Sequence, residues 1–240
     1  MKTCKQLAYS FVLAVGLFAP FLFRAPTASA QGVNDFVITN FDVVYVLTRE
    51  DPQGTLTTTE TIDVNFSGQN HGILRAIPKK YGRVDVKPQI MSVMRDGAVE
   101  PYTTYTENDN LVAKIGSSTL TISGVHRYEI TYTVQNVIAF FEDHDELYWD
   151  VNGTQWLQPF DRVSAKLETE AATSAPVVKC FTGVEGSTES KCETLLGAYS
   201  FGVTTTDRLQ PRETLTFVGS FRKGYFTPMS FWEKYRLWLY

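Results

Sequence analysis

The sequence has few of the residues on which most catalytic and metal sites depend. Its 240 residues include only three histidines and three cysteines. The motif G-x-S-x-G of serine hydrolases and the motif H-E-x-x-H of zinc peptidases are both absent. His71, His126 and His144 do not stand at metal-ligand spacing. The sequence therefore names no reaction, and we expect neither a metal nor a cofactor.

The chain also lacks the basic excess of a nucleic-acid-binding protein. It has 22 Lys and Arg against 26 Asp and Glu, a formal net charge of −4. The first 30 residues contain Lys2, Lys5 and Arg24 but no acid, so the rest has 19 basic and 26 acidic residues, a net charge of −7. Binding to phosphate backbones needs a basic face, so we expect no nucleic-acid partner.

The N-terminal segment has the order of regions found in secretory signal peptides. Lys2 and Lys5 precede an apolar run over residues 7–23, and the small residues Ala-Ser-Ala follow at 28–30. This pattern predicts a signal peptide over residues 1–30, cleaved after the last alanine. A segment retained as a membrane anchor is the alternative. Either way, we expect export to the outer face of the cell membrane or secretion.

Export would place the remaining cysteines in an oxidising compartment. Cys180 and Cys192 remain once residues 1–30 are removed. An even pair in an exported chain predicts a disulfide, and the Gly- and Ser-rich segment between them can bend back. A metal site is disfavoured because no further Cys or His stands at ligand spacing.

Period-two alternation runs through most of the chain. In residues 55–66 one face would carry Leu56, Thr58, Glu60, Ile62, Val64 and Phe66. Such alternation is typical of a strand with one buried face. Residues 38–66 predict one hairpin, and the segments 84–94 and 99–106 around Asp96-Gly97 predict a second.

The remaining strand candidates complete an all-β chain. They are residues 111–116 and 119–124 on either side of Ser117, then 125–136, 161–168, 175–181, 197–203 and 213–221. Residues 167–176 are predicted to be a loop. No helix of ten residues is predicted between 32 and 222. Many short strands predict one domain over residues 31–226, an antiparallel β-sandwich with an immunoglobulin-like appearance.

Several segments resemble, in order, one bacterial family. They are DFVITNFDVVYVL, TLTTTETIDVNFSG, HGILRAIP, GVHRYEITYTV and DELYWDVNGTQWLQPFDRVSAKLE, followed by the Cys180–Cys192 loop and GSFRKGYF. The series resembles the extracytoplasmic N-terminal domain of bacterial predicted membrane proteins classed as domain of unknown function 2207, over roughly residues 34–226. The resemblance implies a cell-envelope location and transmembrane helices after the domain, but no activity. The sequence ends at Tyr240 before such a helix, so we expect either that the chain is cut short of its anchor or that this member is released.

The last residues are rich in aromatic and basic side chains. Residues 227–240 contain Trp232, Trp238 and three further aromatic residues beside Lys and Arg. Such residues gather where a chain meets a membrane surface, so the C-terminal side is predicted to face the membrane. A disordered terminus or a cover for a strand edge is the alternative.

The stretch SGQNHGILRAIPKKYG, residues 67–82, is predicted to be a structural corner. Glu60 falls on the apolar face of its strand, and a buried carboxylate needs a partner. Arg75 can bind it through two parallel hydrogen bonds. Gly72 would allow a turn and Pro78 would fix the exit. The alternative is a catalytic site of His71, Arg75 and Glu60, in which histidine acts as acid or base.

A second charged segment offers a further candidate site. Its acidic residues are Glu142, Asp143, Asp145 and Glu146, on either side of His144. Carboxylates suit hard cations, but the run lacks the alternate spacing and glycine of calcium loops, so a solvated loop is favoured. A carboxylate pair for glycoside hydrolysis stays open.

Trp149 and Trp156 lie on either side of an Asp-Val-Asn-Gly turn. They are predicted to pack across a hairpin, and an exposed carbohydrate platform is the alternative.

Two classes of function follow. The first is a non-catalytic module, tethered to the membrane, that binds a protein or an envelope polymer. The second is an envelope hydrolase that uses the His71, Arg75 and Glu60 corner or the acidic run 142–146. A cation-stabilised adhesion domain is a narrower third possibility.

Overall fold

The computed structural model describes residues 35–49, 51, 53–169, 177–230 and 232. The predicted signal peptide over residues 1–30, most of the predicted loop at 167–176 and most of the aromatic tail lie outside these residues. Every element described here belongs to the unit that follows residue 30. Strands make up its regular structure, as the alternation predicted, and the described residues contain no helix that could cross a membrane.

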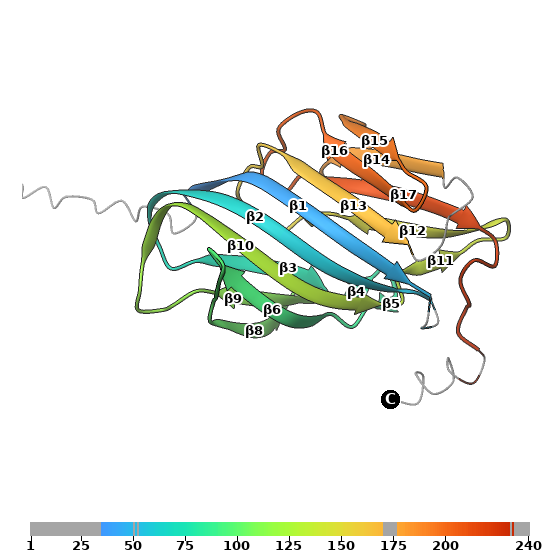
Figure 1. Ribbon diagram of the computed structural model, residues 1–240, viewed down its shortest axis with the longest axis horizontal. Helices are drawn as coiled ribbons and strands as arrows, with labels where there is room; N and C mark the ends of the chain where they lie inside the picture. The colour runs from blue at the N-terminus through green and yellow to red at the C-terminus, as the bar shows by residue number, and fades with distance from the viewer. Residues whose placement is uncertain (1–34, 50, 52, 170–176, 231, 233–240) are drawn as a thin grey trace, which may run out of the picture. The chain divides into compact units, whose positions relative to one another are not determined.

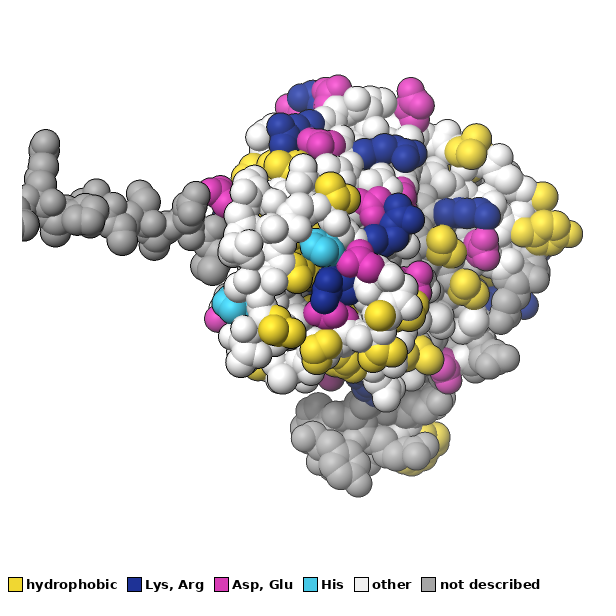
Figure 2. Space-filling model, turned by 60° about the vertical axis from the view of Figure 1, so that its left-hand side comes forward, with side chains coloured by type: hydrophobic (Ala, Val, Ile, Leu, Met, Phe, Trp, Pro, Cys, Tyr) yellow, Lys and Arg dark blue, Asp and Glu magenta, His cyan; other side chains and the backbone are white. Residues whose placement is uncertain are grey.

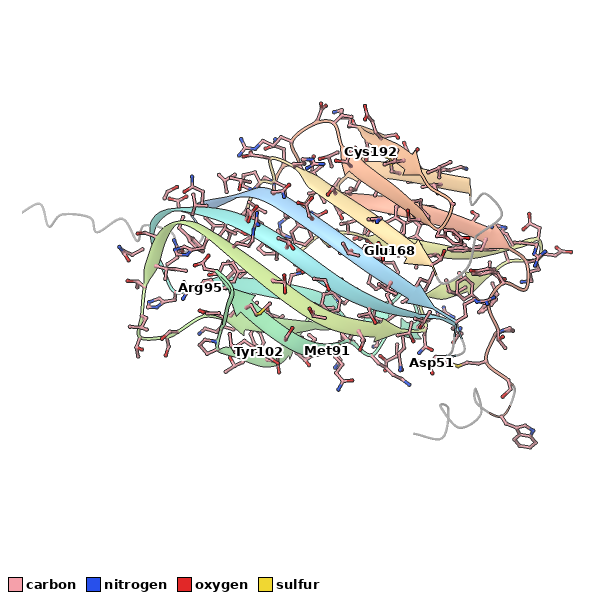
Figure 3. All side chains as sticks on the ribbon, in the orientation of Figure 1. Asp51, Met91, Arg95, Tyr102, Glu168 and Cys192 are labelled. Atoms are coloured by element: carbon pink, nitrogen blue, oxygen red, sulfur yellow. A yellow bond between two sulfur atoms is a disulfide. The ribbon has the colours of Figure 1, made fainter. Side chains whose placement is uncertain are left out.

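The largest sheet has eight strands. In spatial order they are β15 (Cys192–Leu196), β16 (Ser200–Thr205), β13 (Val163–Thr169), β1 (Phe36–Thr48), β2 (Thr55–Asn70), β10 (Ile122–Gln135), β6 (Gln89–Arg95) and β7 (Ala98–Val99). Figure 3 labels Cys192 near one edge of this sheet and Met91 near the other. β1 and β13 pair in parallel, whereas the other pairs are antiparallel.

Three smaller sheets accompany it within the described residues. The four-stranded sheet contains β11 (Ile138–Phe140), β12 (His144–Asp150), β17 (Thr214–Arg222) and β14 (Val177–Gly183). The three-stranded sheet contains β3 (Ile73–Pro78), β9 (Asn110–Ile115) and β8 (Tyr102–Glu107), and β4 (Lys80–Tyr81) pairs with β5 (Val84–Asp85). In Figure 1 the three- and four-stranded sheets lie behind the eight-stranded sheet. The result is a sandwich whose second layer consists of separate sheets.

The core lies between these layers. The predicted apolar face of β2, from Leu56 to Phe66, is buried throughout, and so are Tyr128, Ile130, Tyr132 and Val134 of β10. Contacts between aromatic rings join the layers: Tyr45 of β1 lies 5.8 Å from Phe217 of β17, measured between ring centroids. Alternation therefore identified the buried faces of the two longest strands.

Partners distant in sequence were harder to predict. The predicted hairpin over residues 38–66 forms as β1 and β2, whereas the one around Asp96-Gly97 is short, with Met94 opposite Val99. The chain then leaves the large sheet, and β8 pairs with β9 across a turn at Asn108-Asp109. Residues 111–116 pair with β3 and β8, not with residues 119–124. Local turn signals do not specify which sheet a strand joins.

Candidate functional site

The corner predicted at residues 67–82 forms around a buried ion pair. Alternation points Glu60 of β2 inward, and β3 places Arg75 opposite it. Arg75 donates from Nε to Glu60 Oε2 at 2.7 Å and from Nη2 to Glu60 Oε1 at 2.6 Å. The Glu60 side chain is 0% exposed and the Arg75 side chain is 3% exposed. The structure therefore brings the predicted partners together inside the core.

Further hydrogen bonds join this pair to other elements. Tyr132 of β10 donates its hydroxyl to Glu60 Oε1 at 2.7 Å. Arg75 Nη1 donates to the carbonyl oxygens of Ala76 at 2.7 Å and of Asn152 at 3.1 Å. Trp156 Nε1 donates to that same Asn152 carbonyl at 2.9 Å. The buried charges therefore have hydrogen-bonding partners, which is the condition for stable burial.

Asn152 links the pair to the four-stranded sheet. Its Oδ1 accepts from Leu215 N at 2.9 Å and from the Thr214 hydroxyl at 3.1 Å, and its Nδ2 donates to the Glu213 carbonyl at 2.9 Å. Asn152 lies in the loop after β12, and it is fully buried. Nothing in the local sequence pattern separated this asparagine from an ordinary turn residue, so the prediction missed its role.

The electrostatics of the cluster keep its charges fixed. Burial alone would lower the pKa of Arg75, but the Glu60 carboxylate more than reverses this, and the pKa of Arg75 rises above its usual value. Burial, with the Glu60 charge second, raises the pKa of Tyr45 and of Tyr132 well above the ordinary tyrosine value. Neither tyrosine ionises near neutral pH, so both remain neutral hydroxyl groups beside the Arg75–Glu60 pair.

His71 does not join this cluster. Its side chain is exposed, and its Nδ1 lies 3.0 Å from the Ser117 carbonyl oxygen and 2.9 Å from that of Leu120. Glu60 is sealed in the core, so the two groups of the catalytic alternative do not converge on solvent. His71 instead ties the start of β3 to the loop that follows β9.

Gly72 and Pro78 mark the two ends of β3. Gly72 has φ of +129°, and an added Cβ would lie 1.9 Å from the Ile115 carbonyl oxygen. Gly116 has φ of +117°, and an added Cβ there would lie 2.0 Å from the His71 carbonyl oxygen. The two backbones therefore approach too closely for any side chain. Pro78 is the last residue of β3, as its predicted position at the exit requires.

The acidic segment is only partly a solvated loop. Glu142 and Asp143 are exposed, but Asp145 belongs to β12 and is fully buried. Asp145 Oδ2 accepts from Phe226 N at 3.1 Å, and Lys223 Nζ lies 3.4 Å from its Oδ1. Asp145 therefore holds the chain segment that leaves β17. The prediction of a loop missed this because a two-residue period is hard to see among consecutive charges.

The other residues of the segment form local contacts. His144 Nδ1 lies 2.6 Å from Asp143 Oδ1, and its Nε2 lies 3.4 Å from Glu146 Oε2. The Asp143 carboxylate, with Glu146, raises the pKa of His144. Within the described residues, no three His, Cys, Asp or Glu side chains converge in a way that could hold a metal ion.

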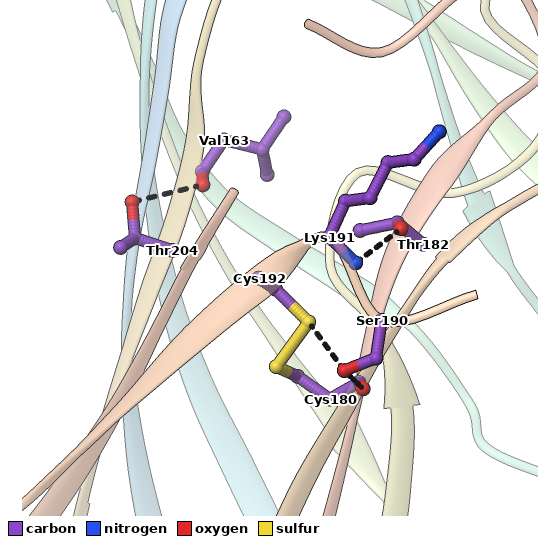
Figure 4. Close-up of a disulfide and its surroundings, with 7 residues drawn as sticks. All are labelled: Val163, Cys180, Thr182, Ser190, Lys191, Cys192 and Thr204. Atoms are coloured by element: carbon purple, nitrogen blue, oxygen red, sulfur yellow. Dashed lines mark hydrogen bonds between the residues drawn. A yellow bond between two sulfur atoms is a disulfide. The ribbon is translucent and has the colours of Figure 1, made fainter. Parts of the chain in front are cut away.

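The tryptophans and cysteines have structural positions. Trp149 and Trp156 are 2% and 5% exposed, so neither forms an exposed platform. The predicted hairpin between them is wrong: β12 pairs with β11 and β17, and Trp156 follows in a loop, packed against Phe41 and Phe160. Cys180 and Cys192 form the predicted disulfide, which joins β14 to β15 (Figure 4).

A polar hollow beside the ion pair was not predicted. It is a cavity of about 330 Å³ between β3, β4, β12, the loop at 153–155 and the turn at 184–187. Its lining includes Arg75, Tyr81, Tyr148, Asp150, Gln155 and Thr216. These residues come from segments far apart in the sequence, so no local spacing could have brought them together. Arg75 and Tyr132 of the buried cluster belong to its lining, so the hollow lies directly against the ion pair.

Charged side chains of both signs are mixed on one face of the protein. On the face shown in Figure 2, Lys and Arg side chains lie beside Asp and Glu side chains. Among the described residues, Arg127 donates from Nε to Asp63 Oδ1 at 2.7 Å and from Nη2 to Asp63 Oδ2 at 2.8 Å. This face carries no broad patch of one sign.

Solved structures resemble the chain in fold alone. Leukotriene A4 hydrolase from yeast, in complex with bestatin, is 8% identical with a TM-score of 0.52 over 82% of this chain and 31% of that chain. An M1 zinc metallopeptidase from Deinococcus radiodurans is 9% identical with a TM-score of 0.45 over 77% of this chain and 42% of that one. The chain thus spans less than half of either protein, and such low identity transfers no activity.

The sequence comparisons give the family. No protein of curated function matches the sequence. Residues 37–221 match the family described as "Predicted membrane protein (DUF2207) N-terminal domain". This match covers most of the chain and nearly all of the β-sandwich, so the chain belongs to this family of N-terminal domains of predicted membrane proteins.

Proposed function

We propose that this chain is a non-catalytic binding module of an exported, membrane-associated protein, and that it engages an envelope polymer or a protein. The observation that carries the proposal is the sealed Glu60–Arg75 pair. The two side chains bind each other, and Tyr132 donates a further buried hydrogen bond to Glu60. A general acid or base has to reach the substrate, which Glu60 does not do at 0% exposure.

The location rests on three separate observations. The family consists of predicted membrane proteins. A disulfide between Cys180 and Cys192 persists in oxidising compartments and is rare in the cytosol. Residues 1–30 have the sequence pattern of an export signal. Together they favour the cell envelope. Because the family is the N-terminal domain of predicted membrane proteins, the proposed attachment to the membrane lies on the C-terminal side.

Glu60 and Arg75, with His71, Gly72 and Pro78, have structural roles in this proposal. The residues Glu142, Asp143, Asp145 and Glu146 bind no cation in it, because Asp145 is directed to Phe226 N and Lys223. The hydrolase alternative draws on the same residues, but its Glu60 is sealed in the core and its Asp145 is buried.

Co-sedimentation with insoluble cell-wall polymer distinguishes binding from hydrolysis. The mature protein is incubated with the polymer, and both the pellet and the soluble fragments are measured. We expect saturable pelleting without release of fragments, and the same behaviour for His71→Ala. Release of fragments by the wild type that His71→Ala abolishes would show that the chain is a hydrolase.

A further inference from the structure

The polar hollow has the size and lining of a small-molecule site. Its volume of about 330 Å³ falls at the lower end of the roughly 300–1,000 Å³ typical of ligand pockets. Aromatic residues form part of the wall: Tyr81 stacks on Trp149 with ring centroids 4.8 Å apart and an interplanar angle of 16°. Tyr148 lies beside them and is 45% exposed, so its ring is available to a ligand.

The polar groups of the hollow are held at fixed positions. Asp150 N donates to the Tyr81 hydroxyl at 2.7 Å, and the Thr216 hydroxyl donates to Asp150 Oδ1 at 2.5 Å. Burial, followed by the Asp150 charge, raises the pKa of Tyr81 well above its usual value, so this phenol stays neutral. Asp150 therefore offers a carboxylate acceptor, and Gln155 adds an exposed amide nearby.

The charges of the lining do not favour an anion. Arg75 and Lys80 are its basic residues, and Asp150 and Glu185 are its acidic residues. The charge of Arg75 is already paired with Glu60, and Lys80 Nζ lies 3.2 Å from Asp109 Oδ1. A phosphate or carboxylate ligand would thus meet two acids and no unpaired arginine. The balance of charges fits a neutral, polar molecule.

We propose that the polar hollow binds a neutral saccharide unit. A sugar ring has an apolar face that can lie on the Tyr148 ring, and hydroxyl groups that can bond to Asp150 and Gln155. A site with aromatic walls and a few fixed polar groups orients such a ligand. The assignment deepens the proposed function, because it rests on the polymer being a glycan that this chain contacts.

Isothermal titration of the mature protein tests the assignment. The probes are tetrasaccharides of N-acetylglucosamine, of glucose and of mannose, with inorganic phosphate as the anionic control. We expect at least one tetrasaccharide to bind with a Kd of about 1 mM or tighter, and phosphate not to bind. The absence of binding by all three tetrasaccharides, or binding of phosphate in their place, would overturn the assignment.

Three variants locate the binding. Tyr148→Ala and Gln155→Ala remove exposed lining groups and are each expected to weaken binding about tenfold, which corresponds to roughly 1.4 kcal/mol. Tyr199→Ala is the matched control, because Tyr199 is 60% exposed and lies between β15 and β16, outside the hollow. It should bind like the wild type. Unchanged affinity in both hollow variants, or an equal loss in the control, contradicts the proposal.

Co-sedimentation separates this assignment from the proposed function. If Tyr148→Ala pellets with cell-wall polymer as the wild type does, the hollow is not the polymer site, and the binding function stands. If tetrasaccharide binding depends on Tyr148 but the wild type does not pellet, the hollow binds saccharide and the polymer function is wrong.

Discussion

Two arginine–carboxylate pairs in this protein share one geometry but differ in their surroundings. Arg75 binds Glu60, and Arg127 binds Asp63, each through Nε and Nη2. The first pair is sealed, whereas the Arg127 side chain is 63% exposed. Water stabilises a lone charge at the exposed pair but not at the buried one. The two pairs should therefore respond very differently to the loss of one partner.

We expect Arg75→Ala to lower the free energy of unfolding by about 3–5 kcal/mol, because Glu60 would remain buried without its partner. Arg127→Ala should cost about 1 kcal/mol or less. Urea denaturation of both variants, compared at equal m-values, measures the difference. Similar costs for the two variants would show that Glu60 finds other solvation when Arg75 is absent.

The buried tyrosines should make the protein sensitive to alkali. Burial, followed by Glu60 or Asp150, raises the pKa of Tyr45, Tyr132 and Tyr81 above the value of 10.0 expected when unfolded. A raised folded-state pKa gives stability that is complete below about pH 10 and is lost as the pH rises further. Three such groups lower the unfolding free energy by up to about 4 kcal/mol per pH unit.

Absorbance of tyrosinate during a pH titration measures this effect. Tyr45, Tyr132 and Tyr81 should ionise only in the unfolding transition, together with the buried Tyr128, whose pKa is also raised by burial. Tyr45→Phe should remove one tyrosine from that transition. A single phase with ordinary pKa values would contradict the expectation.

At this scale the sequence predicted one contact well and its surroundings poorly. The two-residue alternation of β2 placed Glu60 on the strand face that carries apolar residues. Because a buried carboxylate is unstable without a cationic partner, Arg75 could be inferred. Tyr132 lies 72 residues after Glu60, to which it donates, and the Asn152 carbonyl lies 77 residues after Arg75, from which it accepts. Only the packing of the layers brings those groups to the pair.

Among the elements, β3 and β9 are flanked by two glycines at which the backbones lie close together. Gly72 and Gly116 face each other across the start of β3 and the end of β9. Both have positive φ, and a Cβ at either position would overlap a backbone carbonyl oxygen. Because the obstacle is backbone, a rotamer change cannot relieve it.

We expect Gly72→Ala to destabilise the protein by more than about 1 kcal/mol, since the native φ and the contact both exclude a side chain. Gly68→Ala is the matched control: Gly68 lies in β2, and a Cβ there would meet nothing within 4 Å. Thermal unfolding of the two variants gives the comparison. A Gly72→Ala variant as stable as Gly68→Ala would mean that the strands can separate at no cost.

The sequence predicted which face of a strand is buried but not which strand it pairs with. The alternation gave the buried side of β2 and β10, since each face is set by neighbours in the chain. The sequence did not predict that β8 joins the three-stranded sheet instead of the large one. Neither Pro101 before β8 nor the turn at Asn108-Asp109 after it specifies which sheet the strand joins. Long-range pairing is decided by which faces the whole chain can bury together.

At the scale of the whole molecule, cross-links between layers stand out. The ion pair joins β2 of the large sheet to β3, and Asn152 extends this link to β17. The Cys180–Cys192 disulfide joins β14 of the four-stranded sheet to β15 at the edge of the large sheet. Beside it, Lys191 N donates to the Thr182 hydroxyl, and Ser190 donates its hydroxyl to the Cys180 carbonyl (Figure 4). The sequence predicted the disulfide but not that it bridges the two layers.

Reduction of this disulfide should weaken the whole domain. Closing a loop with a sequence separation of 12 residues stabilises a fold by about 3 kcal/mol, chiefly by restricting the unfolded chain. For a protein of this size, that corresponds to a fall in Tm of roughly 6–12 °C. Calorimetry of the mature protein with and without reductant measures it, and the double variant Cys180→Ala with Cys192→Ala serves as the control that reductant should not affect. If reductant leaves the wild-type Tm unchanged, the bond does not restrict the unfolded state, and the layers are held by their packing and the Glu60–Arg75 link alone.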